Sequence, residues 1–239
     1  MPHKSGFVNI IGNPNVGKST LMNALVGEKI SIITKKAQTT RHRIMGIVNG
    51  EDFQIVYSDT PGVLKPAYKL QESMMKYVES ALDDADIILY ITDVYESPNK
   101  NQEFLDKIQN LGVPVILVIN KVDLTTQEKV TEKVDLWSQL MPKARILPVS
   151  ALHNFNCDGL ISLIKETLPE GPEYFSKETL TDKTMRFFAS EIIREKILLH
   201  YQKEIPYSVE VEIEEYKESP KLDSIRAVIY VSRESQKAI

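Results

Sequence analysis

The stretch GNPNVGKS at residues 12–19 has the residue types and the spacing of a phosphate-binding loop. It matches the pattern G-x-x-x-x-G-K-S, and it lies between an apolar β-branched run and a helical pattern. Gly12 and Gly17 permit a tight loop whose backbone N–H groups point inward, and the following helix begins with unpaired N–H groups and the positive end of its dipole. Lys18 can reach the β- and γ-phosphates, and the Ser19 hydroxyl can bind Mg²⁺. We therefore expect a true phosphate loop rather than a glycine-rich turn.

A second motif, NKVD at residues 120–123, indicates which base is bound. The two acceptor oxygens of Asp123 match the paired N–H donors on the Watson–Crick edge of guanine, whereas adenine has a lone acceptor at the ring position. A site built around such a polar pair can reject the mismatched analogue by about 10⁴. Asn120 is expected to tie this segment to the phosphate loop, and the stem of Lys121 is expected to cover the base face.

The dipeptide Ser150-Ala151, followed by Leu152, ends the strand pattern ILPVS, where a backbone N–H can bond the carbonyl oxygen of guanine. Any four-letter match is weak by itself. The order GNPNVGKS, DTPG, NKVD, SA is strong, because each motif ends a strand pattern and ligands of α/β sheets bind at that edge. A small-molecule kinase with a phosphate loop is disfavoured by NKVD and by the lack of an obvious acceptor-substrate pocket.

The turn DTPGV, residues 59–63, follows the strand pattern FQIVYS. Asp59 can hold Mg²⁺ through water, and Gly62 lets a backbone N–H meet the γ-phosphate. The following position often carries a glutamine that orients the attacking water, but Val63 can neither orient water nor donate a hydrogen bond. Between the two phosphate motifs, Thr39 or Thr40 is a candidate second Mg²⁺ ligand.

The segment 33–43 has mixed polarity and no clear period, so we expect a mobile switch. Its basic residues are as well explained by solvated surface as by partner contacts. These residues are Lys35, Lys36, Arg41 and Arg43.

The elements that position these motifs alternate between β-branched runs and helical patterns up to about residue 168. The hairpin signal Asn49-Gly50 adds one antiparallel pair. We therefore predict an α/β domain with a mixed, mostly parallel sheet. Strands are predicted at 7–11, 43–48, 53–57, 86–92, 113–119 and 146–149, and helices at 19–26, 69–82, 102–111, 128–140 and 159–168.

After residue 168 the pattern changes. The breaker cluster PEGP opens a stretch that reads as a linker over 169–182. Asp182 could cap a helix over 183–203, and strictly alternating residues at 207–215 and a second run at 225–231 predict two strands. A helix and two strands make a thin core for a second domain.

The composition argues against several classes of protein. The 239 residues carry a formal net charge of −4 and are 42% hydrophobic, which argues against a disordered chain and against a wholly basic nucleic-acid binder. The single cysteine, Cys157, forms no internal disulfide and reads as a buried small residue, in keeping with a reducing cytosol. The first residues have no signal-peptide core, and the apolar runs are too short for a transmembrane segment.

The chain resembles the Era family of TRAFAC-class GTPases over essentially its whole length. The similar stretches are GNPNVGKSTLMNALVGEKISI, QTTRHRI, SEIIREKIL, IPYSVEVEIEE and IRAVIYVSRESQK. The last two are the most specific, because other GTPases of the class resemble the first domain but not this tail.

The resemblance implies an Era-type GTP-binding domain over 1–168, a linker over 169–182 and a KH domain of type II from 183. It implies binding of GTP and GDP with Mg²⁺, slow GTP hydrolysis, and Thr40 rather than Thr39 as the Mg²⁺ ligand. It also implies that the KH domain binds the 3′ end of small-subunit (16S) rRNA during 30S subunit biogenesis. Members are cytoplasmic and partly associated with the inner membrane.

One departure concerns the KH domain. Such domains clamp the nucleic-acid backbone with a G-x-x-G loop, but none occurs after Gly171. Over 183–239 the KH unit is therefore expected to be partial, with a helix and two strands. The apolar faces of those strands would need covering, which favours a piece of a longer chain over a natural product without the clamp.

The resemblance also offers a substitute for the missing glutamine. Asn15 matches the asparagine that binds a monovalent cation in potassium-dependent relatives, so K⁺ could stabilise transition-state charge, and an ordinary turn residue is the alternative. A scaffold protein gated by nucleotide, with RNA binding and negligible turnover, is the second functional hypothesis. The expected catalytic residues are Lys18, Thr40 and Gly62, and the metal ligands Ser19, Thr40 and Asp59. The expected nucleotide contacts are Gly12, Asn13, Asn15, Val16, Gly17, Lys18, Ser19, Thr20, Asp59, Thr60, Pro61, Gly62, Asn120, Lys121, Asp123, Ser150, Ala151 and Leu152.

Overall fold

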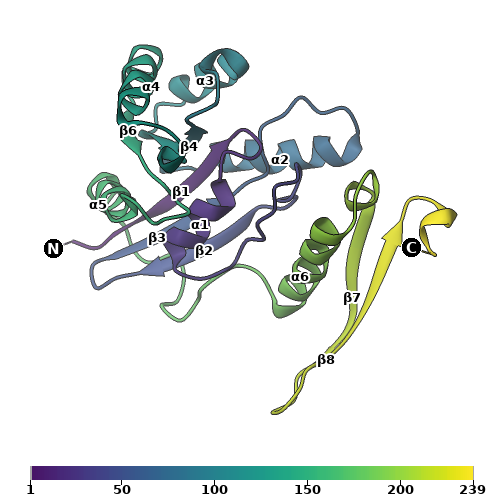
Figure 1. Cartoon of the computed structure of the whole chain (residues 1–239). Helices are drawn as coiled ribbons and strands as arrows, with labels where there is room; N and C mark the ends of the chain where they lie inside the picture. The colour runs from purple at the N-terminus through teal and green to yellow at the C-terminus, as the bar shows by residue number, and fades with distance from the viewer. Residues whose placement is uncertain (1, 239) are drawn as a thin grey trace. The chain divides into compact units, whose positions relative to one another are not determined.

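The computed structural model describes residues 2–238, which form two compact units (Figure 1). The first unit contains residues 2–31 and 40–182, and the second contains residues 32–39 and 183–238. The second unit thus includes an eight-residue piece, 32–39, that comes from the middle of the predicted switch.

The first unit is built on a six-stranded sheet with the order β2-β3-β1-β4-β5-β6. Only the β2–β3 hairpin is antiparallel, so the predicted mixed, mostly parallel sheet is confirmed. Because the other strands run the same way, the motifs at the ends of β1, β3, β5 and β6 reach one edge of the sheet. The strands are β1 (Lys4–Gly12), β2 (Ile44–Asn49), β3 (Phe53–Asp59), β4 (Ile87–Asp93), β5 (Val115–Asn120) and β6 (Arg145–Pro148).

Helices cover both faces of this sheet (Figure 1). Helices α1 and α5 pack together on one face. Helices α2, α3 and α4 share a buried cluster with the strands on the other face, centred on Trp137 and Tyr90. The helices are α1 (Lys18–Val26), α2 (Lys69–Asp83), α3 (Gln102–Asn110), α4 (Gln127–Leu140) and α5 (Cys157–Thr167), with single 3₁₀ turns η1 (Pro98–Asn101) and η2 (Val122–Leu124).

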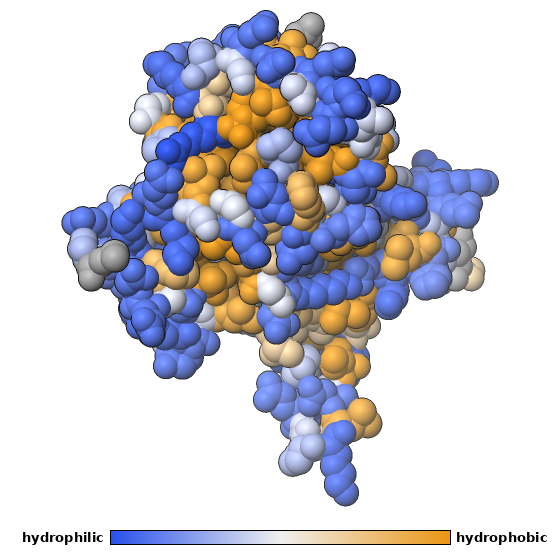
Figure 2. Space-filling view, turned by 60° about the vertical axis from the view of Figure 1, so that its left-hand side comes forward, coloured by the Kyte–Doolittle hydropathy of each residue, from blue (hydrophilic) through white to orange (hydrophobic). Residues whose placement is uncertain are grey.

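Hydrophobic side chains are mostly inside the molecule. On the face shown in Figure 2, hydrophilic residues cover most of the surface and hydrophobic residues show between them in separate patches. Cys157 is buried and unpaired, as predicted. Among the described residues, no helix has the length and apolar character needed to cross a membrane.

The segment 169–182, predicted as a linker, is part of the first unit and is bonded to strand β3. The Gln54 side chain accepts hydrogen bonds from the backbone of Tyr174 and Phe175 at 2.7 and 3.0 Å. The prediction that Asp182 caps the next helix is wrong. Its carboxylate instead accepts the backbone N–H of Met45 at 2.8 Å. The cap is Thr184, whose extended backbone lets its hydroxyl accept the N–H of Phe187.

The second unit consists of α6 (Met185–His200) packed on the antiparallel pair β7 (Val209–Lys217) and β8 (Ser224–Val231), with 3₁₀ turns η3 (Ile205–Tyr207) and η4 (Glu234–Gln236). Its small core joins Ile197 to Val209 and Val211. The glutamates between these β7 positions face solvent, as the strict alternation predicted. Ile225 and Ile229 of β8 remain 45% and 48% exposed, so helix α6 covers only part of the pair.

The piece 32–39 is held by the middle of α6. Arg194, only 2% exposed, pairs with Glu191 at 2.6 Å and donates to the carbonyl of Thr39. Glu195 accepts the backbone N–H of Ile33 at 3.3 Å. Within the second unit, this part of the predicted switch is therefore a defined structure with partners of its own.

Arg43 is not the surface residue or partner contact that we had predicted. It is buried and forms a two-pronged ion pair with Asp84, with N···O distances of 2.7 and 2.8 Å. The remaining guanidinium donors reach Ser58, Ser80 and Asn9. Because all its donors are satisfied, Arg43 anchors the chain just after Thr40 to the sheet and α2.

Candidate active site

The phosphate loop connects β1 to α1 and turns at Gly17, which has a φ of 97°. A Cβ there would lie 2.3 Å from the side-chain nitrogen of Asn120, so both the backbone angle and the close approach require glycine. The Lys18 ammonium folds back over the loop and donates to the carbonyls of Gly12 and Asn13 at 3.1 and 2.8 Å. The positive charge of Lys18 therefore lies within the phosphate loop.

The buried environment of the Lys18 ammonium favours binding of an anion. Burial lowers the pKa of its ammonium from 10.5 to about 8, while the carboxylates of Asp59 and Glu96 partly oppose that shift. A buried cation with carbonyl partners lacks a full counter-charge. Bound phosphate groups would supply that charge and restore the pKa of Lys18 towards its ordinary value.

Three oxygen-bearing side chains meet beside the loop. The Ser19 hydroxyl donates to Asp59 at 2.7 Å and lies 2.9 Å from the hydroxyl of Thr40. The other carboxylate oxygen of Asp59 is buried without a hydrogen-bond partner, and burial raises the pKa of this carboxyl although the Ser19 hydroxyl and the Lys18 charge oppose the rise. A hard oxygen set with an unpaired carboxylate oxygen suits Mg²⁺.

The turn after β3 lies directly against the phosphate loop. A Cβ at Gly62 would lie 2.7 Å from the backbone nitrogen of Pro14, so only glycine permits this approach. The backbone N–H of Val63 donates to the carbonyl of Gly12 at 3.0 Å, and its side chain, 8% exposed, joins the core under α2, α3 and α4. Val63 is thus a core residue in this structure. Thr60 precedes Pro61 and is buried, with its hydroxyl donating to the carbonyl of Ile10.

The base motif is tied to the phosphate loop from β5, as predicted for Asn120. The amide of Asn120 donates to the carbonyl of Val16 at 2.9 Å and accepts the backbone N–H of Ala151 at 3.0 Å. The Ser150 hydroxyl donates to the Asp123 carboxylate, which fixes its orientation. Leu152 is largely exposed at the rim of the site, and Thr20 continues α1 behind Ser19.

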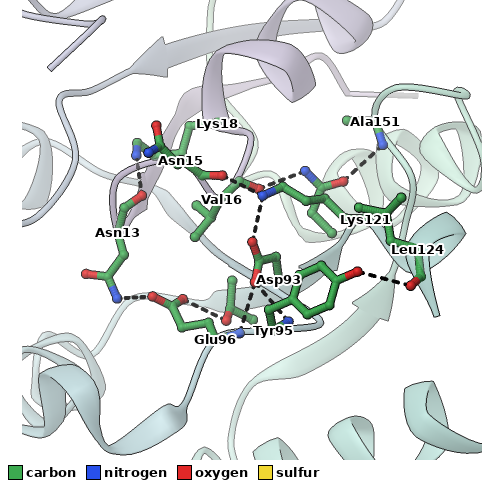
Figure 3. Close-up of polar contacts among 12 residues, drawn as sticks. Asn13, Asn15, Val16, Lys18, Asp93, Tyr95, Glu96, Lys121, Leu124 and Ala151 are labelled. Carbon is green, nitrogen blue, oxygen red and sulfur yellow. Dashed lines mark hydrogen bonds and ion pairs between the residues drawn. The ribbon is translucent and has the colours of Figure 1, made fainter. Parts of the chain in front are cut away.

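Sequence reasoning missed three residues near these motifs. Asp93, the last residue of β4, contacts Lys121, and Glu96, in the turn that follows, contacts Asn13 (Figure 3). His153 lies 3.7 Å from the Asp123 carboxylate. The position of Asp93 at the carboxyl end of a buried strand was the available signal, because that edge carries the other motifs.

A mixed sheet that brings a phosphate loop, an Mg²⁺-type oxygen set and a guanine-type motif to one edge defines a phosphate-loop GTPase. A family model for the 50S ribosome-binding GTPase matches residues 7–121. The chain is 43% identical to a GTPase Era of Alkaliphilus metalliredigens over 100% of this chain and 82% of that protein. It is 42% identical to a GTPase Era of Staphylococcus haemolyticus, over 99% of this chain and 80% of that protein. The chain therefore belongs to the Era GTPase family.

Two solved Era structures resemble the whole described chain. One is Era in complex with MgGDPNP and nucleotides 1506–1542 of 16S ribosomal RNA, with a TM-score of 0.93, 39% identity, and coverage of 98% of this chain and 81% of that chain. The other is a variant of Aquifex aeolicus Era bound to GDP and AlF₄⁻, with a TM-score of 0.92 and 39% identity over the same shares. The family resemblance drawn from the motifs is confirmed.

Proposed function

We propose that this GTPase binds GTP and GDP with Mg²⁺ at the edge described above and acts as a slow switch in assembly of the small ribosomal subunit. The observation that carries the proposal is the meeting of Ser19, Thr40 and Asp59 beside the buried Lys18 ammonium. Two related structures hold guanine nucleotides, one of them with magnesium.

Each part of the site has a role in nucleotide binding. Backbone N–H groups of the phosphate loop surround the β-phosphate, and Lys18 donates to the β- and γ-phosphates. Asp123 accepts from the guanine edge, while a backbone N–H in Ser150-Ala151-Leu152 donates to the guanine carbonyl. Asn120 links the phosphate loop to the segment Ser150-Ala151-Leu152 through its bonds to Val16 and Ala151. The proposed contact set is Gly12, Asn13, Asn15, Val16, Gly17, Lys18, Ser19, Thr20, Asp59, Thr60, Pro61, Gly62, Asn120, Lys121, Asp123, Ser150, Ala151 and Leu152.

Ser19 and Thr40 would hold Mg²⁺ through their hydroxyls, and Asp59 would hold it through water. When bound, the ion supplies positive charge to the β- and γ-phosphate oxygens. Thr40 connects the site to the piece 32–39, because that piece ends at the residue before it. Loss of the γ-phosphate would release Thr40 and thereby the switch.

Hydrolysis must proceed without a water-orienting side chain after Gly62, because Val63 is turned into the core. Backbone groups of the two switch segments would place the water, and the Gly62 N–H would stabilise charge on the γ-phosphate. Such a site lacks one of the usual catalytic groups. We therefore propose a slow intrinsic rate.

We expect K⁺ to accelerate hydrolysis, with Asn15 as its ligand. Asn15 is exposed at the mouth of the loop with a φ of 66°, and its carbonyl, rather than its side chain, bonds Lys121. Asn15→Gly keeps the positive φ and removes only the side chain, so it should lower the K⁺-supported rate by about tenfold. The measurement is phosphate release in K⁺ and in Na⁺ at equal ionic strength. Equal rates in the two salts would contradict potassium use.

We propose that the stretch from residue 183 onwards forms part of a KH domain and that its partner is the 3′ end of small-subunit rRNA. A related Era structure is a complex with nucleotides 1506–1542 of 16S ribosomal RNA. The 239-residue sequence contains no G-x-x-G clamp after Gly171, so we expect it to bind this RNA more weakly than micromolar. A fluorescence titration with the RNA 3′ end tests this. A sub-micromolar dissociation constant would contradict it.

Phosphate release under multiple turnover, with and without the 30S subunit, tests the switch as a whole. Sustained GDP production supports the GTPase switch, whereas tight GTP binding with negligible turnover in both cases would favour a scaffold gated by nucleotide. Cytoplasmic location with partial association with the inner membrane follows from the family resemblance and is part of this proposal.

A further inference from the structure

Asp93 ends strand β4 and is 8% exposed at the edge that carries the nucleotide motifs. One carboxylate oxygen accepts the backbone N–H groups of Tyr95 and Glu96 at 3.0 and 2.9 Å. The other oxygen lies 2.7 Å from the ammonium of Lys121 (Figure 3). One side chain therefore both shapes the turn after β4 and binds the lysine of the base motif.

Lys121 has a second partner, because its ammonium also donates to the carbonyl of Asn15 at 2.6 Å (Figure 3). Its backbone is in the left-handed region with a φ of 63°. A long lysine side chain loses conformational entropy when it is ordered. Because two acceptors already hold the Lys121 side chain in the free protein, less of this entropy is lost when the nucleotide binds. The stem between the backbone and the ammonium of Lys121 is the part proposed to cover the base.

The turn that follows Asp93 is itself bonded to the phosphate loop. The Glu96 carboxylate accepts from the amide of Asn13 and from the hydroxyl of Thr92, the latter at 2.8 Å. From helix α4, Lys133 donates to the carbonyl of Glu96 at 2.7 Å. The turn is therefore bonded on two sides, which gives Asp93 a defined position relative to the loop.

We propose that Asp93 is a positioning residue for nucleotide binding. It holds the Lys121 ammonium against the Asn15 carbonyl, so that the lysine stem lies preformed over the base and slows nucleotide release. This inference rests on the proposed nucleotide site and adds a residue that acts through Lys121.

Asp93→Asn isolates the ionic contact. An asparagine oxygen can still accept from the backbone N–H groups of Tyr95 and Glu96, so the turn is kept, but the negative charge that faces Lys121 is removed. We expect the dissociation rate of fluorescent GDP to rise about five- to tenfold, because a partly buried charge-assisted contact is lost. The preference for GDP over XDP should stay as in the unmodified protein, since Asp123 is untouched.

A double-mutant cycle with Lys121→Met separates positioning from a general structural effect. In the Lys121→Met background, Asp93→Asn should change the GDP dissociation rate by less than about twofold. Asp86→Asn is the matched control, because Asp86 lies just before the same strand, at its other end, and accepts the Phe7 N–H at 2.7 Å. It should leave GDP dissociation unchanged. Asp93→Ser, which also retains an acceptor for the turn, provides a second variant if the asparagine variant does not fold.

Two results would overturn the inference: an unchanged GDP dissociation rate in both Asp93 variants, or an equal rise in rate with and without Lys121. If the unmodified protein does not bind GDP at all, the proposed nucleotide site is wrong and this inference falls with it. The unmodified protein thus distinguishes the two failures.

Discussion

Asp123→Asn is expected to reverse the base preference from guanine to xanthine. The carboxylate offers two acceptors to the N–H donors of guanine, whereas an asparagine amide presents a donor that suits the additional carbonyl of xanthine. Ser150 holds the carboxylate in place through its hydroxyl, and an asparagine oxygen can accept that same bond. GDP affinity should fall by about 10³–10⁴-fold, because the guanine N–H donors would lose their two-oxygen acceptor, and XDP affinity should rise. Competition titrations with the two nucleotides measure both changes.

The control for this substitution is Asp135→Asn on the exposed side of α4, which removes the same charge away from the site. It should leave both affinities unchanged. If the Asp123 variant retained its preference for GTP and GDP, the assignment of NKVD as the base motif would have to be abandoned.

Lys18→Ala is expected to abolish nucleotide binding, with a loss of at least about 10³-fold in GDP affinity. The ammonium is the buried cation at the centre of the phosphate loop, and its two carbonyl partners cannot attract an anion without it. The folded protein without nucleotide should not be destabilised at neutral pH. The pKa of Lys18 is lowered to about 8 because burial disfavours its charged form. This burial therefore reduces the stability of the folded protein below pH 8, and the reduction disappears as pH rises towards 10.5. Calorimetric titration and thermal melting test both statements.

The same lowered pKa predicts that nucleotide binding takes up protons. Near pH 8 part of the Lys18 population is neutral in the free protein, and bound phosphates raise its pKa so that it becomes fully charged. GDP affinity should therefore decrease as pH rises through about 8. Calorimetry in two buffers of different ionisation enthalpy measures the uptake directly. Binding without proton uptake would show that Lys18 is already fully charged in the free protein.

The sheet and its helices could be predicted from the sequence because their signals are local. Buried parallel strands appear as β-branched runs, and the helices between them have their own period. Boundaries moved by only a few residues, as in β3, which extends to Asp59 and so places that carboxylate at the end of the strand. The order of the four nucleotide motifs also followed from local patterns, since each lies directly after a strand.

The residues that sequence reasoning placed wrongly or missed are charged residues whose partners are distant along the chain. Arg43 was assigned to the surface or to a partner, yet it is buried against Asp84. Asp182 was expected to cap a helix and instead bonds Met45. Asp93 went unnoticed because its partner Lys121 directly follows the neighbouring strand β5, 28 positions further along the chain. No local pattern specifies which charges will be brought together and desolvated.

The sequence by itself determined the class of fold and the Era family, and it predicted the phosphate loop and the guanine motif, because all of these depend on residue types at short, fixed spacings. Only the tertiary structure decided that Val63 belongs to the core, that residues 32–39 pack with α6, and that Asp93 supports Lys121. The physical reason is that burial and charge pairing depend on which distant elements share a surface. That sharing is settled by the packing of the whole chain and not by any segment of it.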